Sequence, residues 1–481
     1  MSGVRALVAR LLRGALVSGV LGVSMGVTHA PAEAASRRVL GALKPAAVVT
    51  TRVVDVDSKS GLASRVFVQK LDGRVAGKLK TEDSLDGAAS FGLAPGRYRI
   101  TATHGPEYTV DQREVTVGAG DATVELALRR VVDAGRWVSC DLHVHSSTSF
   151  DSHVSPEARA RALWAAGVAF GAPTEHDAVG SYEGTAAMAR GLRSVHAMEV
   201  TPRAPAVGHF TVLPYAGETA PNTSHVSPTR LLRELRAGSP DALIQINHPR
   251  LSSGMGYFNV IRFDARRGFK SDPLPPEVDT IEVLNGIVLR QPAQTEQVMH
   301  EWAALFEAGH GRWATAGSDV HHPAQIPGVP RSYARPATGS DAGLIAALRT
   351  GHSFATSGPF LELSQGDRIP GDRGQVSEGK ITVHVRLQAA PWIDVRHVEL
   401  WAGGVPVWHR ELAERAVRVG PPGPDAASER SEAVRFDEDV TIAVPPGARA
   451  VLAVARGARS LKATLPGVDA LPVAVTNPLT L

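Results

Sequence analysis

Several features that would quickly place a chain in a class are scarce in this one. Cys140 is the only cysteine in 481 residues, so no internal disulfide is possible and stability must come from packing. Basic and acidic residues nearly cancel, with a formal net charge of +3, which argues against nucleic acid as a partner. Hydrophobic residues make up 43% and charged residues 21%, proportions typical of a globular protein rather than of a disordered chain or a membrane bundle.

The N-terminus has the pattern of a secretory leader. Arg10 and Arg13 precede an apolar run, Gly14 to Val27, that is too short to cross a bilayer, and small residues follow around Ala30 to Ala35. We expect residues 1–35 to be a signal peptide and the mature protein to be secreted or periplasmic. We also expect no stable membrane insertion after removal of this leader, and a mature net charge near zero.

Two regions of the chain alternate with the two-residue period of β-strands. Residues 45–132 do so between Gly- and Pro-containing turns, which predicts a small antiparallel β-sandwich. This region has no cluster of titratable residues, so a substrate- or surface-binding module and a structural appendage both remain open. Residues 361–481 are predicted to form a second β-rich domain, in which the Gly- and Pro-rich stretch 420–432 is expected to be a flexible loop.

Between these regions, residues 136–360 alternate strand-like and helix-like segments, which predicts an α/β domain with a parallel sheet or barrel. Ser155-Pro156 and Ser227-Pro228 are typical helix starts. The segments expected to be strands are 168–174, 194–198, 209–213, 242–246, 280–284 and 313–317. The segments expected to be helices are 155–166, 227–236, 291–308 and 341–349.

This central region is organised around the stretch Asp141-Leu142-His143-Val144-His145. Alternate side chains of a strand point the same way, so His143 and His145 aim at one point, with Asp151 just beyond it. Later strands also close on His, Asp or Glu, at Thr174-Glu175-His176-Asp177, Glu199, Asn247-His248-Pro249 and Ser318-Asp319-Val320-His321-His322. His209 opens the strand expected at 209–213.

One such histidine is as easily a hydrogen-bonded structural residue as a ligand, but this recurrence favours a shared site. In β/α barrels, reacting groups gather at the carboxyl ends of the strands, where several segments of the chain converge. Imidazole and carboxylate together suit zinc, manganese and iron alike. The pattern therefore predicts a centre of two or three divalent metal ions.

These motifs resemble those of the PHP metallohydrolases (the polymerase and histidinol phosphatase type), and most closely the carbaryl-hydrolase-like CehA/McbA branch. The resemblance runs from Leu142 to His321, and Thr356-Ser357-Gly358-Pro359-Phe360 and Val475-Thr476-Asn477-Pro478 extend it. It implies a distorted (β/α)7 PHP barrel flanked by the N-terminal β-sandwich and the C-terminal β-rich domain. Carried over by position, it implies three groups of metal ligands: His143, His145, Glu199 and Asp319, with Glu199 bridging; His209 and His248; and Asp151, His176 and His321.

One position departs from the family pattern. Members of the family place a ligand directly after the serine of this loop, whereas here Phe150 separates Ser149 from Asp151. His153 is therefore an alternative to Asp151, and the occupancy of the third metal position stays open.

The predicted chemistry needs no nucleophilic side chain. Metal ions close together would acidify a bound water and polarise the scissile group. Beyond residue 35 the chain has no Gly-x-Ser-x-Gly elbow, in agreement with this mechanism. Asp319, His321 and Arg250 are the predicted catalytic residues. Arg250 would clamp an anionic oxygen, and its alternative role is a surface salt bridge.

Neighbouring polar residues have two interpretations each. Glu175 and Asp177 would either orient the metal ligands or act as capping and solvated carboxylates. His322 would either donate a proton or pack. Tyr257 and Asn285 are candidates for the pocket wall.

The leading interpretation is a secreted metal-dependent hydrolase that cleaves an ester, carbamate or phosphoester bond of a small molecule with a metal-activated water. The branch favours carboxyl or carbamate esters, and the family at large favours phosphoesters. The alternative is a non-catalytic secreted metal-binding protein whose β modules bind a surface or a carbohydrate. The sequence indicates no particular oligomeric state.

Overall fold

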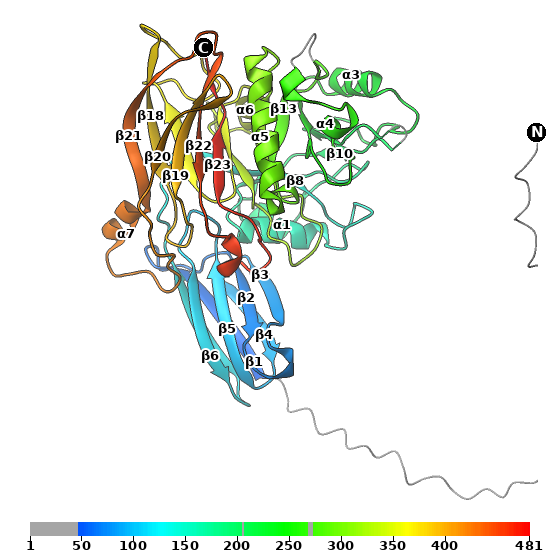
Figure 1. Ribbon diagram of the computed structural model, residues 1–481. Helices are drawn as coiled ribbons and strands as arrows, with labels where there is room; N and C mark the ends of the chain where they lie inside the picture. The colour runs from blue at the N-terminus through cyan, green and yellow to red at the C-terminus, as the bar shows by residue number, and fades with distance from the viewer. Residues whose placement is uncertain (1–46, 204–205, 268–272) are drawn as a thin grey trace, which may run out of the picture. The chain divides into compact units, whose positions relative to one another are not determined.

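The computed structural model describes residues 47–203, 206–267 and 273–481, and the predicted signal peptide lies outside these ranges. The described chain is a mixed α/β structure, rich in sheet and with few helices (Figure 1). Within it, no helix combines the length and the apolar character that crossing a membrane requires.

The first seven strands form two sheets, ordered β4-β1-β7 and β3-β2-β5-β6, around one hydrophobic core. The sequence predicts strands at 53–56, 65–68, 97–103, 113–117 and 123–128, so it misses β3 and β4. The expectation of only antiparallel pairs was also wrong, because β1 and β7 pair in parallel. Charged residues in β3 and small residues in β4 hide their alternation. The strands are β1 (Ala47–Asp55), β2 (Ser64–Lys70), β3 (Leu79–Ser84), β4 (Ala88–Leu93), β5 (Gly96–Thr103), β6 (Asp111–Val117) and β7 (Ala122–Leu128).

The next seven strands carry the predicted ligands. Five of them form one sheet, β10-β11-β12-β13-β14, whereas β8 and β9 pair in another. The strands are β8 (Val138–Val144), β9 (Phe170–Pro173), β10 (Met198–Val200), β11 (Phe210–Leu213), β12 (Leu243–Ile246), β13 (Thr280–Asn285) and β14 (Trp313–Gly317).

These two groups of strands meet at both ends through isolated parallel bridges, one between His176 and Glu199 and one between Val144 and Val320. The β8–β9 and β12–β13–β14 pairs are parallel, as predicted, but β11 runs antiparallel to both of its neighbours. The closed seven-stranded barrel therefore stays a prediction.

One predicted strand is misplaced. The strand expected at 194–198 begins instead at Met198, which pairs with Val212 of β11. Pro214, directly after β11, has no N–H to donate. Beyond it, only the hydrogen bond from Tyr215 N to the His196 carbonyl, at 2.8 Å, continues the pairing toward residue 194 in the described chain.

The helices begin where the capping signals predict. The Ser155 and Ser227 hydroxyls accept hydrogen bonds from the Ala158 and Arg230 N–H groups, and a proline follows each serine. The α-helices are α1 (Pro156–Ala165), α2 (Ala186–Ala189), α3 (Pro228–Gly238), α4 (Tyr257–Val260), α5 (Pro292–Glu307), α6 (Asp341–Arg349) and α7 (Ala426–Ala433). Short 3-10 turns lie at Gly73–Val75, Ala265–Arg267, Val288–Arg290 and Leu461–Ala463.

Helix α7 corrects the prediction of a flexible loop at 420–432. The Asp425 carboxylate accepts hydrogen bonds from the N–H groups of Ala427 and Ser428, and Glu429 pairs with Arg129. A cap and an ion pair to a distant strand thus order a stretch whose Gly and Pro content suggested disorder.

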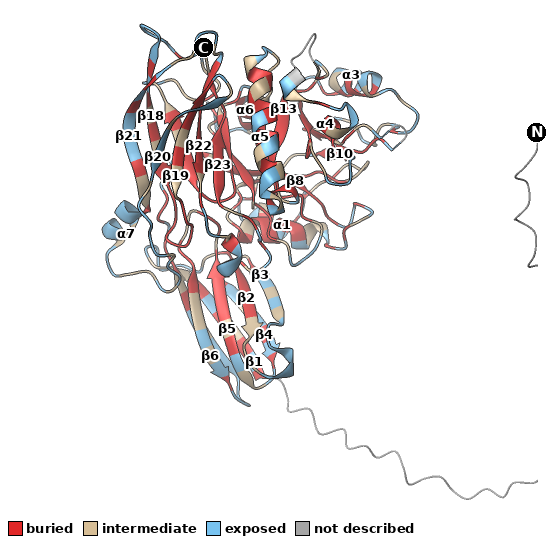
Figure 2. Ribbon diagram, in the orientation of Figure 1, coloured by how far each residue is buried: buried red, intermediate tan, exposed pale blue. Residues whose placement is uncertain are grey.

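The C-terminal strands continue the sheet that holds His143 and His145. A nine-stranded sheet follows the order β20-β19-β22-β23-β16-β15-β8-β9, with β24 on β22, while β17, β18 and β21 form a separate sheet. The buried strands of the nine-stranded sheet are red in Figure 2. The strands are β15 (Arg331–Ala334), β16 (Ser353–Thr356), β17 (Phe360–Ser364), β18 (Lys380–Gln388), β19 (His397–Ala402), β20 (Val405–Glu411), β21 (Val434–Ala443), β22 (Ala450–Arg456), β23 (Val473–Thr476) and β24 (Leu479–Thr480).

This continuity bears on the predicted domains 45–132, 136–360 and 361–481. Phe354 of β16 pairs with Thr476 of β23, so hydrogen bonds cross the boundary expected near residue 360. Pro45–Leu481 also behaves as one compact unit. The three divisions remain predictions about independent folding.

Candidate metal centre

Strand β8 presents His143 and His145 to one point, as their i, i+2 spacing predicts. Both side chains are fully buried. His143 Nε2 lies 3.2 Å from Glu199 Oε1 and 3.4 Å from Asp319 Oδ1. His145 Nε2 lies 3.5 Å from Glu199 Oε2 and 3.3 Å from Asp319 Oδ1. Two imidazoles and two carboxylates from β8, β10 and the end of β14 thus face one another.

Glu199 is the central carboxylate of a larger group. Its Oε1 lies 3.2 Å from His209 Nδ1 and 3.4 Å from His248 Nε2. Its Oε2 lies 2.9 Å from His176 Nδ1. Since His209 precedes β11 and His248 follows β12, a single fully buried glutamate joins ligands from most of the predicted strands.

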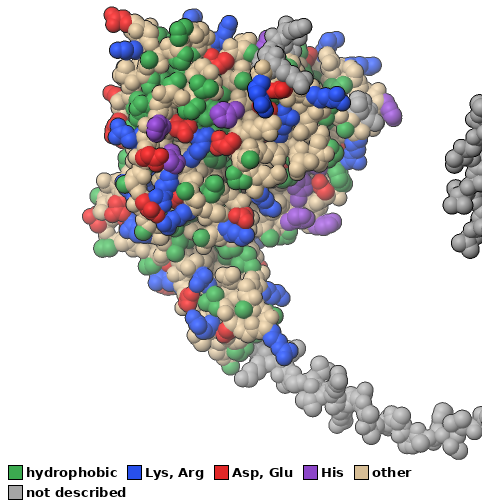
Figure 3. All heavy atoms as spheres, viewed as in Figure 1, with side chains coloured by type: hydrophobic (Ala, Val, Ile, Leu, Met, Phe, Trp, Pro, Cys, Tyr) green, Lys and Arg blue, Asp and Glu red, His purple; other side chains and the backbone are tan. Residues whose placement is uncertain are grey.

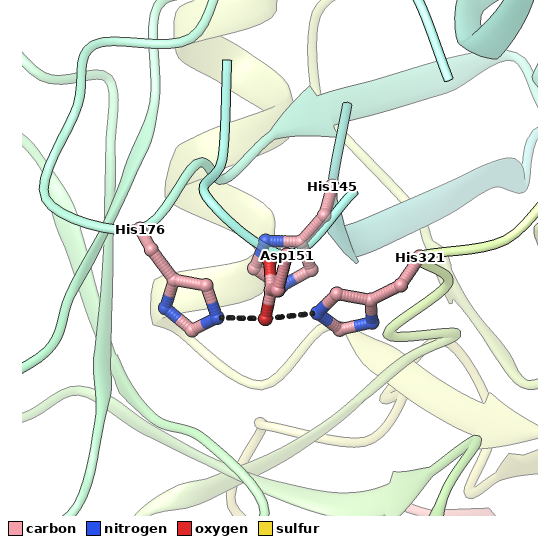
Figure 4. Close-up of side chains that lie close together, drawn as sticks. All are labelled: His145, Asp151, His176 and His321. Carbon is pink, nitrogen blue, oxygen red and sulfur yellow. Dashed lines mark ion pairs between the residues drawn. The ribbon is translucent and has the colours of Figure 1, made fainter. Parts of the chain in front are cut away.

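A third set of groups lies on the other side of His145 (Figure 4). Asp151 Oδ2 lies 3.3 Å from His176 Nε2 and 3.2 Å from His321 Nε2. The ring of His145 stacks on that of His321, with centroids 4.2 Å apart. Asp151, rather than the exposed His153, therefore occupies the position that the sequence left open between them.

All nine predicted metal ligands lie in this one cluster. Their potential ligand atoms fall into four overlapping groups, each with its atoms within 4.8 Å of one another. The groups are His143, His145 and Asp319; His143, Glu199 and His248; His176, Glu199 and His209; and His145, Asp151, His176 and His321.

The spacing of these donors fits a shared cation better than direct hydrogen bonds. Most contacts between imidazole nitrogens and carboxylate oxygens of the cluster, at 3.2–3.5 Å, exceed the roughly 2.7–2.9 Å of charge-assisted hydrogen bonds. The contact of 2.9 Å between His176 Nδ1 and Glu199 Oε2 is the exception. The longer contacts match the edge of about 3.3 Å between neighbouring ligands on a tetrahedral ion with bonds of about 2.0–2.1 Å. The donor spacing therefore fits a divalent metal ion.

Several buried donor atoms in the cluster also lack a hydrogen-bond partner. They are His143 Nε2, His145 Nε2, Asp151 Oδ1, Glu199 Oε2 and His248 Nδ1. Buried polar atoms are nearly always paired, because an unpaired one forfeits its hydration. A bound cation would satisfy the lone pairs of His143 Nε2, His145 Nε2 and Glu199 Oε2, which face one another in the cluster.

Partners behind the histidines fix the direction of each ring. His143 Nδ1 lies 3.0 Å from Glu282 Oε1, so that Nε2 faces the cluster. His145 Nδ1 lies 3.0 Å from Ser149 Oγ, which in turn donates to Glu175 Oε2 at 2.6 Å. A carboxylate behind a ligating imidazole sets its tautomer and raises its basicity.

Glu175 and Asp177 both have orienting roles. Glu175 also accepts hydrogen bonds from the backbone and side chain of Ser146, which fixes the loop after β8. Asp177 Oδ1 accepts a hydrogen bond from Thr201 N, and the Thr201 hydroxyl lies 2.7 Å from His176 Nδ1. The structure therefore supports the interpretation that Glu175 and Asp177 orient the metal ligands, rather than the interpretation that they are capping or solvated carboxylates.

Glu282, Asn247 and Asn285 act in the site in ways that the sequence did not reveal. Besides meeting His143, Glu282 accepts hydrogen bonds from His248 N and Asn285 Nδ2. Asn285 also donates to Asp319 Oδ2, and Asn247 donates to Glu199 Oε1. A lone carboxylate inside the otherwise apolar segment 280–284 was the available signal for Glu282.

The backbone is strained where the ligands are placed. Asp177, His248 and Asp319 have φ values of 48°, 25° and 52°, in a backbone region that residues other than glycine seldom adopt. Such conformations persist only where the surroundings enforce them, and they concentrate at functional sites.

Electrostatics gives the cluster carboxylates of lowered pKa and, at His143, His176 and His248, imidazoles of raised pKa. Burial by itself lowers the pKa of His143, but the carboxylates of Asp319, Glu282 and Glu199 reverse this and hold the pKa well above its usual value. Burial lowers the pKa of His145 to about 4. Burial raises the pKa values of Glu199 and Asp319, yet the surrounding histidines hold both well below their usual range.

Arg250 does not serve the site as its position next to His248-Pro249 suggested. Its Nη2 and Nε pair with both oxygens of Glu301 on α5, at 2.6 and 2.9 Å, and Nη2 also donates to the Phe263 carbonyl. The salt-bridge alternative is therefore what the structure shows, although the pair is largely buried rather than on the surface.

Tyr257, a candidate for the pocket wall, and His322, a candidate proton donor, have different surroundings. Tyr257 is buried, and its hydroxyl donates to the Pro273 carbonyl. His322 is exposed next to His321 and does not pack.

The cluster is open to solvent on one side. Asp151, His209 and His321 have side chains that are 33%, 16% and 15% exposed, whereas His143, His145 and Glu199 are at 0%. Figure 3 shows histidine side chains reaching the surface as a group in the lower right of the view. A substrate would therefore enter past Asp151 and His321.

Comparisons with known proteins are weak. No family model matches the sequence, and no curated protein matches it either. Solved structures that are similar include a two-domain protein from Bacteroides vulgatus containing a predicted PHP-like metal-dependent phosphoesterase, at 15% identity and TM-score 0.37, covering 72% of this chain and 95% of that one. An amidohydrolase from Chromobacterium violaceum with bound sulfate and no metal has 19% identity and TM-score 0.25, covering 39% and 89%.

A third similar structure, BcpA, the major pilin subunit of Bacillus cereus, has 20% identity and TM-score 0.15, covering 18% of this chain and 30% of that one. Likenesses with TM-scores this low assign neither fold nor function. The donor set of the cluster stands on its own chemistry.

Proposed function

We propose that this protein is an exported metal-dependent hydrolase of the PHP type, in the carbaryl-hydrolase-like branch, that cleaves an ester bond of a small molecule. The observation that carries the proposal is the convergence of six histidines and three carboxylates whose inward atoms are spaced as ligands and partly lack other partners. The alternative, metal binding without catalysis, has no observation in its favour, and the open face of the cluster speaks for access by a substrate.

The chain itself would hold two or three ions. His143, His145, Glu199 and Asp319 would hold one, His209 and His248 with Glu199 a second, and Asp151, His176 and His321 a third. Bound divalent ions would supply Lewis acidity toward water and toward the scissile carbonyl or phosphoryl oxygen.

The remaining work falls to side chains that orient and carry protons. Hydrolysis adds the oxygen of water to carbonyl carbon or phosphorus, breaks the bond to the leaving oxygen, and passes a proton from the water to that oxygen. Asn285 and Asn247 hold the carboxylates of Asp319 and Glu199 in place through the transfer. His322, exposed beside the ligand His321 on the open side, is the group placed to move the proton.

The test combines metal analysis with an ester panel. The purified mature chain should contain two or three transition-metal ions per molecule and hydrolyse at least one of phenyl acetate, a phenyl carbamate and phenyl phosphate. Chelation should abolish that activity, and adding back the metal should restore it. Bound metal without turnover of any ester would favour the non-catalytic alternative, and a chain that takes up no metal would refute both.

A further inference from the structure

Phe150 and Arg203 form an exposed pair at the open side of the cluster. The Phe150 side chain is 65% exposed, although apolar rings of this size normally seek burial. Its ring centroid lies 4.9 Å from that of His176. The guanidinium carbon of Arg203 lies 4.6 Å from the Phe150 centroid, which is the geometry of a cation–π contact. Phe150 thus lies between a predicted metal ligand and a surface arginine.

The chain segment that carries Arg203 runs out of the cluster itself. Glu199 is the central carboxylate, and two residues later the Thr201 hydroxyl meets His176. Arg203 comes two residues after Thr201, and alternate residues of an extended chain share a face. Pro202 biases Thr201 toward the extended conformation. The same face of the segment therefore offers a ligand, a hydrogen-bonding hydroxyl and a guanidinium in succession.

Arg203 presents its charge at the surface. Over residues 47–203, 206–267 and 273–481, Arg203 has no carboxylate within ion-pair distance, and its side chain is exposed. Arg250, by contrast, is bound on two sides by Glu301. Of these two arginines, Arg203 is therefore the one whose guanidinium is not paired with a carboxylate of the described residues.

We propose that Arg203, held over Phe150, recognises a negatively charged group of the substrate, so that the enzyme acts on anionic esters. This rests on the proposed hydrolase function. A guanidinium presents paired N–H donors that match the oxygens of a phosphoryl, carboxylate or sulfonate group. The platform of Phe150 keeps the flexible arginine at the edge of the cluster, which lowers the entropy lost when the anion binds.

Kinetics on matched substrates test the proposal. The metal-loaded mature chain is assayed on phenyl acetate, 4-carboxyphenyl acetate and phenyl phosphate. Arg203→Met removes the charge but keeps the aliphatic stem. It should raise KM about five- to tenfold for the anionic substrates that the enzyme turns over, as expected for the loss of one charged contact at an exposed site, and leave phenyl acetate unchanged.

Two further variants and a control separate recognition from structure. Phe150→Leu keeps apolar bulk without the π face and should give a smaller loss with the same selectivity. Arg203→Lys should retain part of the anion preference. Arg233→Met, on the exposed face of α3, removes the same charge elsewhere and should change nothing. Equal changes on neutral and anionic esters, or no change in Arg203→Met, would overturn the proposal.

A binding measurement keeps this proposal apart from the hydrolase function. If no ester is turned over, calorimetric titration of the metal-loaded protein with phenylphosphonate still probes Arg203. Affinity that is five- to tenfold weaker in Arg203→Met than in the unmodified chain would support the anion contact even though hydrolysis had failed. Equal affinity in the two proteins would refute it.

Discussion

Gly317 lies against His143 so closely that it leaves no room for a methyl group. A Cβ atom at Gly317 would stand 2.4 Å from His143 Cβ and 2.6 Å from Glu282 Oε1. The last residue of β14 therefore has to be glycine for β8 to bring its histidine to the cluster.

The substitution Gly317→Ala should lower metal content and activity together. The added methyl must push apart His143 and Glu282, both buried, and packed interiors yield little. We expect a loss of metal affinity of about tenfold or more, since displacing a partner behind a ligand commonly has that effect. Gly118→Ala is the matched control, because a Cβ there meets nothing within 4 Å. A variant that binds metal normally would contradict this account of Gly317.

Glu282→Gln should weaken metal binding without unfolding the chain. The carboxylate meets His143 Nδ1 and accepts hydrogen bonds from His248 N and Asn285 Nδ2, whereas an amide offers one acceptor oxygen and leaves an N–H₂ facing donors. Metal affinity should fall roughly 10- to 100-fold, the usual effect of losing a carboxylate behind a metal-bound histidine. Competition with a chromophoric chelator measures it, and Glu125→Gln, exposed on β7, is the control.

The ligand positions could be predicted from the sequence because all except His209 lie near or beyond the carboxyl end of a strand, and strand ends converge. Their partners could not. Glu282 and His143 stand 139 residues apart, so no spacing rule links them. The prediction for Arg250 was wrong for a related reason. Its position next to the Asn-His-Pro motif can be read from the sequence, but the direction of its side chain is set by Glu301 of α5.

The fold shows the same division between local and distant information. Serine caps predicted the starts of α1 and α3, since a cap needs only the next three residues. The antiparallel pairing of β15 with β8, which joins the C-terminal sheet to the metal strand, depends on residues such as Ser332 and Cys140 that lie far apart in the chain. Periodicity gives strands but not their neighbours.

Asp319 offers a test in which charge and backbone can be separated. Its φ of 52° is tolerated by asparagine far better than by alanine. Asp319→Asn should therefore keep the fold and its thermal midpoint while reducing turnover at least about a thousandfold, because the amide cannot replace an anionic ligand. Asp319→Ala should lose activity equally and also cost about 1 kcal/mol of stability. Near-normal activity in Asp319→Asn would remove this residue from the reaction.

His104, which is not one of the predicted metal ligands, should make the protein less stable in acid. Burial lowers the pKa of His104 to about 4, opposed by the Ala165 carbonyl that its ring contacts. Because this folded-state value lies below the unfolded value of about 6.5, the neutral ring contributes stability that is complete above pH 6.5 and is lost as the pH falls toward 4.

The loss attributable to His104 should reach roughly 2–3 kcal/mol between pH 7 and 4. His104→Asn keeps a donor for the Ala165 carbonyl but does not titrate, so the urea midpoint of this variant should fall less than that of the unmodified chain over the same interval. His196→Asn, with a side chain 46% exposed, should follow the unmodified chain. Parallel pH curves for all three proteins would show that protonation of His104 has no part in acid unfolding.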